Sequence, residues 1–125
     1  MPLPERVALG IEQFNRREFF EAHETIEAEW MIAGDDLREL YQGIIQVAVA
    51  CHHAEEGNWR GARSVLSRAT PKLGKYLPAC QGIDVAELLA QVQRLSAELD
   101  RLDPPGVGRL ETAIFPVIRF VKHEA

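Results

Sequence analysis

The sequence is poor in the residues that mark secreted, disordered and membrane-spanning proteins. Its two cysteines, Cys51 and Cys80, form no Cys-x-x-Cys pair, and we expect no secretory leader. Seven prolines and nine glycines in 125 residues are too few for a disordered chain. No apolar run approaches the roughly 20 residues that span a bilayer. We therefore expect a cytoplasmic protein with no membrane partner, in which Cys51 is a small buried hydrophobe.

An excess of positive charge is also missing. The chain has 14 Lys and Arg residues against 19 Asp and Glu residues, which gives a formal net charge of -5. This balance opposes a general affinity for phosphate backbones, because such binding needs a concentrated basic face. We therefore predict that nucleic acid is not a partner. One segment does gather basic residues, at a spacing typical of the solvated side of a helix: Arg60, Arg63, Arg68, Lys72 and Lys75.

Strand patterns are absent, and helical patterns take their place. Nothing alternates with a period of two beside a hairpin turn, whereas apolar residues recur at steps of three and four. A chain of 125 residues fits one domain with one core. The sequence therefore predicts a single all-α domain over residues 1–125, an array or bundle of about five helices. Their expected ranges are 4–14, 16–33, 36–56, 58–76 and 84–102, followed by an apolar extended tail over 103–125.

Capping residues set the expected helix boundaries. In a capping box, the first side chain and a glutamate three residues later satisfy free amides at the start of a helix. The pattern occurs three times, at Asn15 with Glu18, Asp36 with Glu39, and Asp84 with Glu87. Asn58 is a further candidate cap, and Pro71 is expected to kink or end the helix that Asn58 begins.

Several polar side chains stand where helical periodicity predicts apolar ones. Within 16–33, His23, Glu24 and Glu27 share a largely aromatic face. The helix over 36–56 is apolar nearly all round, yet a narrow stripe of it carries Gln42, Gln46, Val49 and His53. Because the two helices are neighbours in a hairpin, we expect the polar stripes to face each other. The predicted pocket consists of His23, Glu24, Glu27, Arg38, Gln42, Gln46 and His53.

Two interpretations of this pocket remain open. As a site, His23 and Glu27 would hold a divalent metal with Glu24 or His53 as the third ligand, leaving water in the open position for hydrolysis. As a purely structural network, the glutamines would tie the helices together, and Arg38 would pair with Glu24 or Glu27.

A second class of function is a binding or scaffold module that works by self-association. The apolar tail and the leucine stripe from Leu88 to Leu102 would offer their surface to a second copy, giving a homodimer. In that case the polar cluster would be structural only.

The order of several short segments resembles a known family. These segments are Phe14-Asn15, Glu18 to Glu24, Glu27, Trp30, Tyr41 to Gln46, and Gly57-Asn58. Together they resemble the prokaryotic helical family catalogued as domain of unknown function 309, over about Phe14 to Tyr76. The resemblance implies a compact all-helical protein with no established activity. The family's motif falls on Phe20, Glu21, His23, Glu24, Glu27, Trp30, Gln42, Gln46 and His53.

Overall fold

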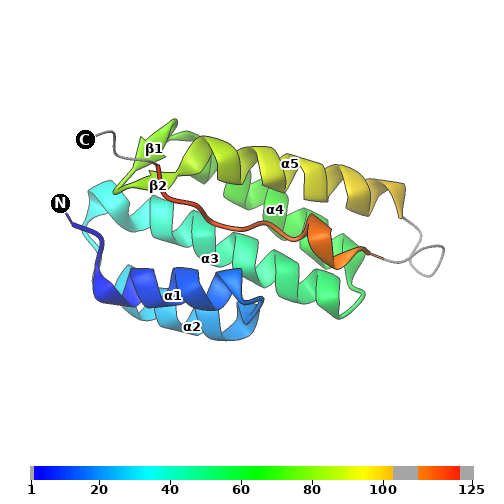
Figure 1. Ribbon diagram of the computed structural model, residues 1–125, viewed down its shortest axis with the longest axis horizontal. Helices are drawn as coiled ribbons and strands as arrows, with labels where there is room; N and C mark the ends of the chain where they lie inside the picture. The colour runs from blue at the N-terminus through cyan, green and yellow to red at the C-terminus, as the bar shows by residue number, and fades with distance from the viewer. Residues whose placement is uncertain (1, 103–109, 122–125) are drawn as a thin grey trace.

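The computed structural model describes residues 2–102 and 110–121, and within them the predicted all-α fold is confirmed. The α1–α2 hairpin lies on one side of α3, and α4 and α5 lie on the other (Figure 1). Because α3 is covered on both sides, most of it is buried, as its apolar sequence predicts. The helices are α1 (Glu5–Asn15), α2 (Phe19–Trp30), α3 (Asp35–Glu55), α4 (Trp59–Gly74) and α5 (Val85–Arg101).

A small hairpin joins α4 to α5, and the sequence did not predict it. Strand β1 (Ala79–Cys80) pairs antiparallel with β2 (Ile83–Asp84) through a turn in which Gln81 and Gly82 have φ values of 51° and 80°. Positive φ at both central positions is typical of the tight turn that suits the twist of a hairpin. The expectation of no strand pairing was therefore wrong, because two-residue strands are too short to show alternation.

Two of the predicted caps are confirmed. The backbone N–H of Gly61 donates to Asn58 Oδ1 at 2.9 Å, and that of Glu87 donates to Asp84 Oδ1 at 3.0 Å. The predicted start at Asn15 is wrong, because α2 begins only at Phe19 and the side chain of Asn15 binds the C-terminal tail instead.

Two other predicted boundaries are also shifted. Helix α3 begins at Asp35, with Gly34 and not Asp36 at the N-cap position. Helix α4 continues through Pro71 to Gly74, so it does not end at that proline.

Close helix packing fixes the core around α2 and α3. A Cβ atom on Gly10 of α1 would lie 2.2 Å from Ile26 Cγ1, and one on Gly43 of α3 would lie 2.8 Å from Leu73 Cδ2. The absence of a side chain at these two positions lets the helices approach. Cys51 is buried in this core, as expected, and burial raises the pKa of its thiol well above its ordinary value.

The C-terminal tail crosses the bundle in a mainly extended form (Figure 1). Phe115 and Ile118 are buried against the helices, and the leucine stripe of α5 is buried too. The chain itself therefore covers much of the surface that was expected to bind a second copy, whereas Phe120 is 48% exposed. Residues 103–109 and 122–125 of the predicted tail lie outside the described residues. Among the described helices, none is long and apolar enough to cross a membrane.

Candidate functional site

Two ladders of side chains line a groove between the antiparallel helices α2 and α3. Residues three or four positions apart point in similar directions from a helix, so each turn adds one or two members to a ladder. On α2 the members are Phe20, His23, Glu27 and Trp30, and on α3 they are Gln42, Ile45, Gln46, Val49 and His52. We call this surface the α2–α3 groove.

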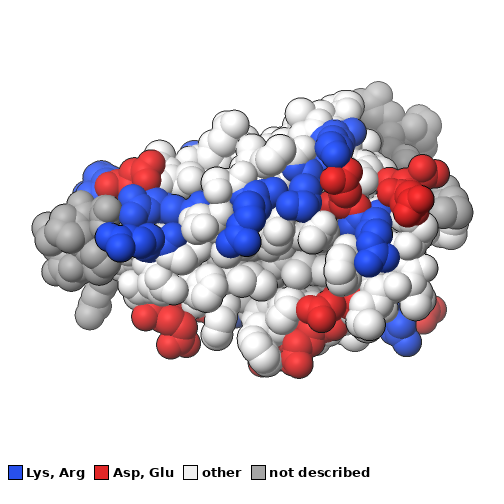
Figure 2. Space-filling model, turned by 180° about the vertical axis from the view of Figure 1, so that it is seen from behind, with Lys and Arg blue, Asp and Glu red and all other residues white. Residues whose placement is uncertain are grey.

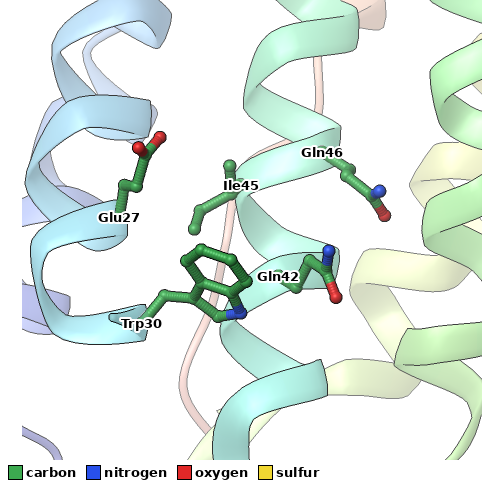
Figure 3. A pocket seen from close by; sticks show the side chains of 5 residues that line it. All are labelled: Glu27, Trp30, Gln42, Ile45 and Gln46. Carbon is green, nitrogen blue, oxygen red and sulfur yellow. The ribbon is translucent and has the colours of Figure 1, made fainter. Parts of the chain in front are cut away.

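One end of the groove is a polar hollow of about 210 Å³, lined by Glu27, Trp30, Gln42, Ile45 and Gln46. Glu27 and Trp30 reach from α2 toward α3, whereas the amides of Gln42 and Gln46 extend on the far side of Ile45 from Glu27 (Figure 3). Two buried atoms of these residues, Trp30 Nε1 and Gln46 Oε1, have no hydrogen-bond partner. The side chains that line the polar hollow therefore carry one unused donor and one unused acceptor, both buried beneath its surface.

Arg38 holds the Trp30 wall of the polar hollow. Its guanidinium carbon lies 4.3 Å from the centre of the Trp30 ring, and its Nη1 donates to the Trp30 carbonyl oxygen at 3.3 Å. A cation over an indole ring is attracted to the electron-rich face. The predicted ion pair of Arg38 with Glu24 or Glu27 does not form among the described residues. Arg38 instead fixes the position of the indole.

The predicted network of amides between the helices is not formed. Within the described part of the chain, the side-chain hydrogen bond that joins α3 to α2 comes from Arg38. Gln42 and Gln46 make no hydrogen bond to α2 there, and Gln46 Oε1 is unpaired. The two glutamines therefore line a cavity without tying the helices together.

His23 and Glu27 are in direct contact in the groove, with His23 Nε2 2.7 Å from Glu27 Oε2, within ion-pair distance. Their side chains are 26% and 45% exposed, so the pair stands at the surface of the groove and not in a closed interior. Glu24 is exposed, and it lines an outer hollow with His23 and Glu27. Among the described residues, however, no three His, Cys, Asp or Glu side chains are arranged to hold a metal ion. The predicted three-ligand metal site is thus not assembled.

The other end of the groove is an apolar hollow of about 110 Å³, lined by Phe19, Phe20, His23, Val49 and His52. The half-exposed Phe20 ring lies 5.9 Å from the His23 ring and 5.7 Å from the His52 ring, between centroids. His52 was not among the predicted pocket residues, and the structure places it here.

His53 does not line the groove. Its Nδ1 lies 3.5 Å from Asn58 Nδ2, at the turn between α3 and α4, and it lines neither the polar nor the apolar hollow. Of the predicted pocket residues, His53, Glu24 and Arg38 thus line neither hollow, whereas His52, Trp30 and Phe20, which were not predicted, do.

The charges around the groove are mostly negative. Helix α2 carries four glutamates and no Lys or Arg, whereas α4 carries four basic residues and no acidic one. Helix α4 lies behind α3 in Figure 1, and Lys and Arg side chains form a band across that rear face (Figure 2). The α2 wall of the groove therefore favours neutral or cationic molecules over anions.

A further hollow of about 300 Å³ lies near the end of α3, lined by Ala54, Glu55, Trp59, Leu110, Thr112 and Phe115. Trp59 Nε1 is buried there without a hydrogen-bond partner. Burial raises the pKa of the Glu55 carboxyl, and this effect outweighs the lowering by His52 and Arg17. The charged form of Glu55 is therefore disfavoured in the folded state.

We expect Glu55→Gln to stabilise the fold more at pH 7 than at pH 4. Because its pKa is raised on folding, Glu55 favours the folded state at low pH, and this contribution is lost as the pH rises through the raised pKa. Urea unfolding at both pH values measures the difference. Glu56→Gln, which removes the same charge from the next position, is the control. Equal gains from Glu55→Gln at the two pH values would contradict the assignment.

Comparison with known proteins confirms the resemblance inferred from the sequence. Residues 7–65 match the family model described as Domain of unknown function (DUF309). An uncharacterized protein of Aquifex aeolicus (strain VF5) is 26% identical over 93 residues, which cover 74% of this chain and 28% of that protein. The chain thus spans less than a third of that relative's length. Neither description names an activity, a substrate or a partner.

Proposed function

We propose, from the site alone because the matched family has no described function, that the polar hollow binds a small neutral or cationic molecule. The observation that carries this proposal is the pair of unpartnered atoms, Trp30 Nε1 and Gln46 Oε1, on residues that line one cavity. A buried polar group without a partner costs roughly 1–3 kcal/mol, so a ligand that pairs with both atoms, once the Trp30 and Gln46 side chains turn toward it, recovers that energy on binding. The ligand class is a compound with both a carbonyl-type acceptor and an N–H or O–H donor.

The size of the cavity limits the ligand. A cavity of about 150 Å³ is enough to hold benzene. The polar hollow, at about 210 Å³, therefore suits a molecule or group only slightly larger than benzene. Ile45 and the Trp30 ring supply apolar walls, and Glu27 supplies a carboxylate at the rim. These features favour a small amide or amine.

Hydrolysis is the reaction to test first in this groove. If the His23 Nε2–H group donates a hydrogen bond to Glu27 Oε2, the second ring nitrogen, Nδ1, carries a free lone pair. Nδ1 has no hydrogen-bond partner among the described residues. An imidazole oriented by a carboxylate is a suitable general base for water. We assign this role to the His23–Glu27 pair and not to a metal, because the predicted ligands are not brought together.

The binding proposal is tested by following the indole N–H of Trp30 in NMR spectra during titration with N-methylacetamide. We expect a saturable shift of the Trp30 signal, identified by its loss in Trp30→Phe. The shift should be absent from Gln46→Leu, which removes the assigned acceptor. Acetate should produce a much smaller effect, since Glu27 borders the cavity. An equal shift in Gln46→Leu, or no shift in the native protein, would exclude a specific site.

A further inference from the structure

The polar hollow and the apolar hollow lie at successive turns of the same two helices. His23 lines the apolar hollow, Glu27 lines the polar one, and the two side chains are in contact. On α3, Gln46 and Val49 are one turn apart and line the polar and the apolar hollow respectively. One elongated molecule can therefore occupy both hollows by lying across the His23–Glu27 pair.

The helix geometry gives the length of such a molecule. The α3 residues of the two hollows are centred six to seven positions apart, which at a rise of about 1.5 Å per residue is roughly 10 Å. The α2 residues give a similar separation. An extended peptide covers roughly 3.3–3.6 Å per residue, so three residues match the distance between the hollows.

We propose that the ligand of the α2–α3 groove is an extended peptide segment of about three residues, with an apolar side chain in the apolar hollow. This inference rests on the proposed binding function of the polar hollow. Once the Trp30 and Gln46 side chains turn toward the ligand, a peptide backbone offers a carbonyl to Trp30 Nε1 and an N–H to Gln46 Oε1, the two buried groups of this hollow that lack a partner. The apolar hollow, about 110 Å³ in volume, has room for a side chain such as leucine but not for a large aromatic group.

The negative charges beside the groove favour peptides that carry a positive charge. Glu24 is exposed beside the groove and has no ion-pair partner among the described residues, and α2 carries no basic residue. A peptide with a free amino terminus or a lysine therefore fits the groove better than an acidic one. The exposed Phe20 ring, which contacts both imidazole rings of the apolar hollow, provides the surface on which the apolar side chain would pack.

The test compares two probe peptides, Leu-Gly-Gly amide and Gly-Gly-Gly amide, each with a free amino terminus. We expect the leucine peptide to bind roughly tenfold more tightly, because it buries one additional apolar side chain. Val49→Phe fills the apolar hollow, and Phe20→Ala removes its exposed wall. Both variants should erase the preference for leucine. Leu77→Ala, which removes a similarly exposed apolar side chain outside the groove, should leave the preference intact.

The outcomes separate this inference from the proposed function. N-methylacetamide occupies only the polar hollow, so its effect on the Trp30 indole should survive in Val49→Phe and Phe20→Ala. Equal affinities of the two peptides, together with normal binding of N-methylacetamide, would overturn the peptide inference alone. Competition by a simple alkyl amide as strong as that by the leucine peptide would overturn it in the same way. If neither N-methylacetamide nor the peptides bind, both proposals fail.

Discussion

Replacing Gln46 by leucine is expected to raise the free energy of unfolding by about 1–2 kcal/mol and to abolish binding of N-methylacetamide. The Oε1 atom of Gln46 is buried without a hydrogen-bond partner, so the native amide lowers the stability of the folded state. Leucine is of similar size and would replace the unpaired amide by an apolar group. The same change removes the acceptor to which we assign the ligand.

Urea unfolding and the Trp30 indole titration measure the two effects. Gln42→Leu is the matched control: it lies one turn away on the same wall, but no buried oxygen of Gln42 is left unpaired. Its expected change in stability is correspondingly smaller. A loss of stability in Gln46→Leu would show that the amide already has a favourable partner in solution, which would remove the main support for the binding site.

This prediction separates a ligand site from a structural network. A structural polar cluster makes its own hydrogen bonds, so truncating any member destabilises the fold. A binding site, in contrast, is often kept polar at the expense of stability, because its groups are paired only when the ligand is present. The unpaired atoms of Trp30 and Gln46 match the second description.

Helical periodicity predicted most of the residues that line the groove, but it did not determine which histidine of α3 lines its last turn. Steps of about 3.6 residues from Gln42 lead to Gln46, to Val49 and then to a point between positions 52 and 53. The sequence favoured His53, whereas in the structure His52 lines the groove and His53 contacts Asn58. Adjacent positions on a helix differ by about 100°, and only the packing of α3 against its neighbours decides which of them faces α2.

Partners distant in the sequence account for the other differences. Asn15 and Glu18 carry a good local capping pattern, yet Asn15 instead exchanges two hydrogen bonds with the backbone of Ile118. Arg38 was expected to form an ion pair with a carboxylate, but its guanidinium group stacks on the Trp30 ring instead. Local patterns gave the type of the long helices, whereas competition from a tertiary partner is not visible in them.

Gln91→Leu is expected to lower the free energy of unfolding by about 2–4 kcal/mol. Gln91 lies on the apolar side of α5 and is only 9% exposed. Its Nε2 donates to the Val117 carbonyl oxygen and its Oε1 accepts from the Val117 N–H, both at 2.8 Å. Leucine would suit the hydrophobic stripe of α5 yet would leave both polar groups of Val117 without partners. The hydrophobic pattern of α5 would therefore predict the effect of leucine at position 91 wrongly.

The expected effect of Gln91→Leu is large because Gln91 holds the C-terminal tail. Phe115 and Ile118, on either side of Val117, are buried against the bundle, so without Gln91 the half-buried Val117 backbone is only partly accessible to water. Urea unfolding measures the loss, and amide hydrogen exchange of residues 110–121 shows whether the tail detaches. Gln93→Leu, an exposed glutamine on the same helix, should change stability by less than about 0.5 kcal/mol. If Gln91→Leu behaves like Gln93→Leu, the tail is held by apolar packing alone, and the paired hydrogen bonds contribute little.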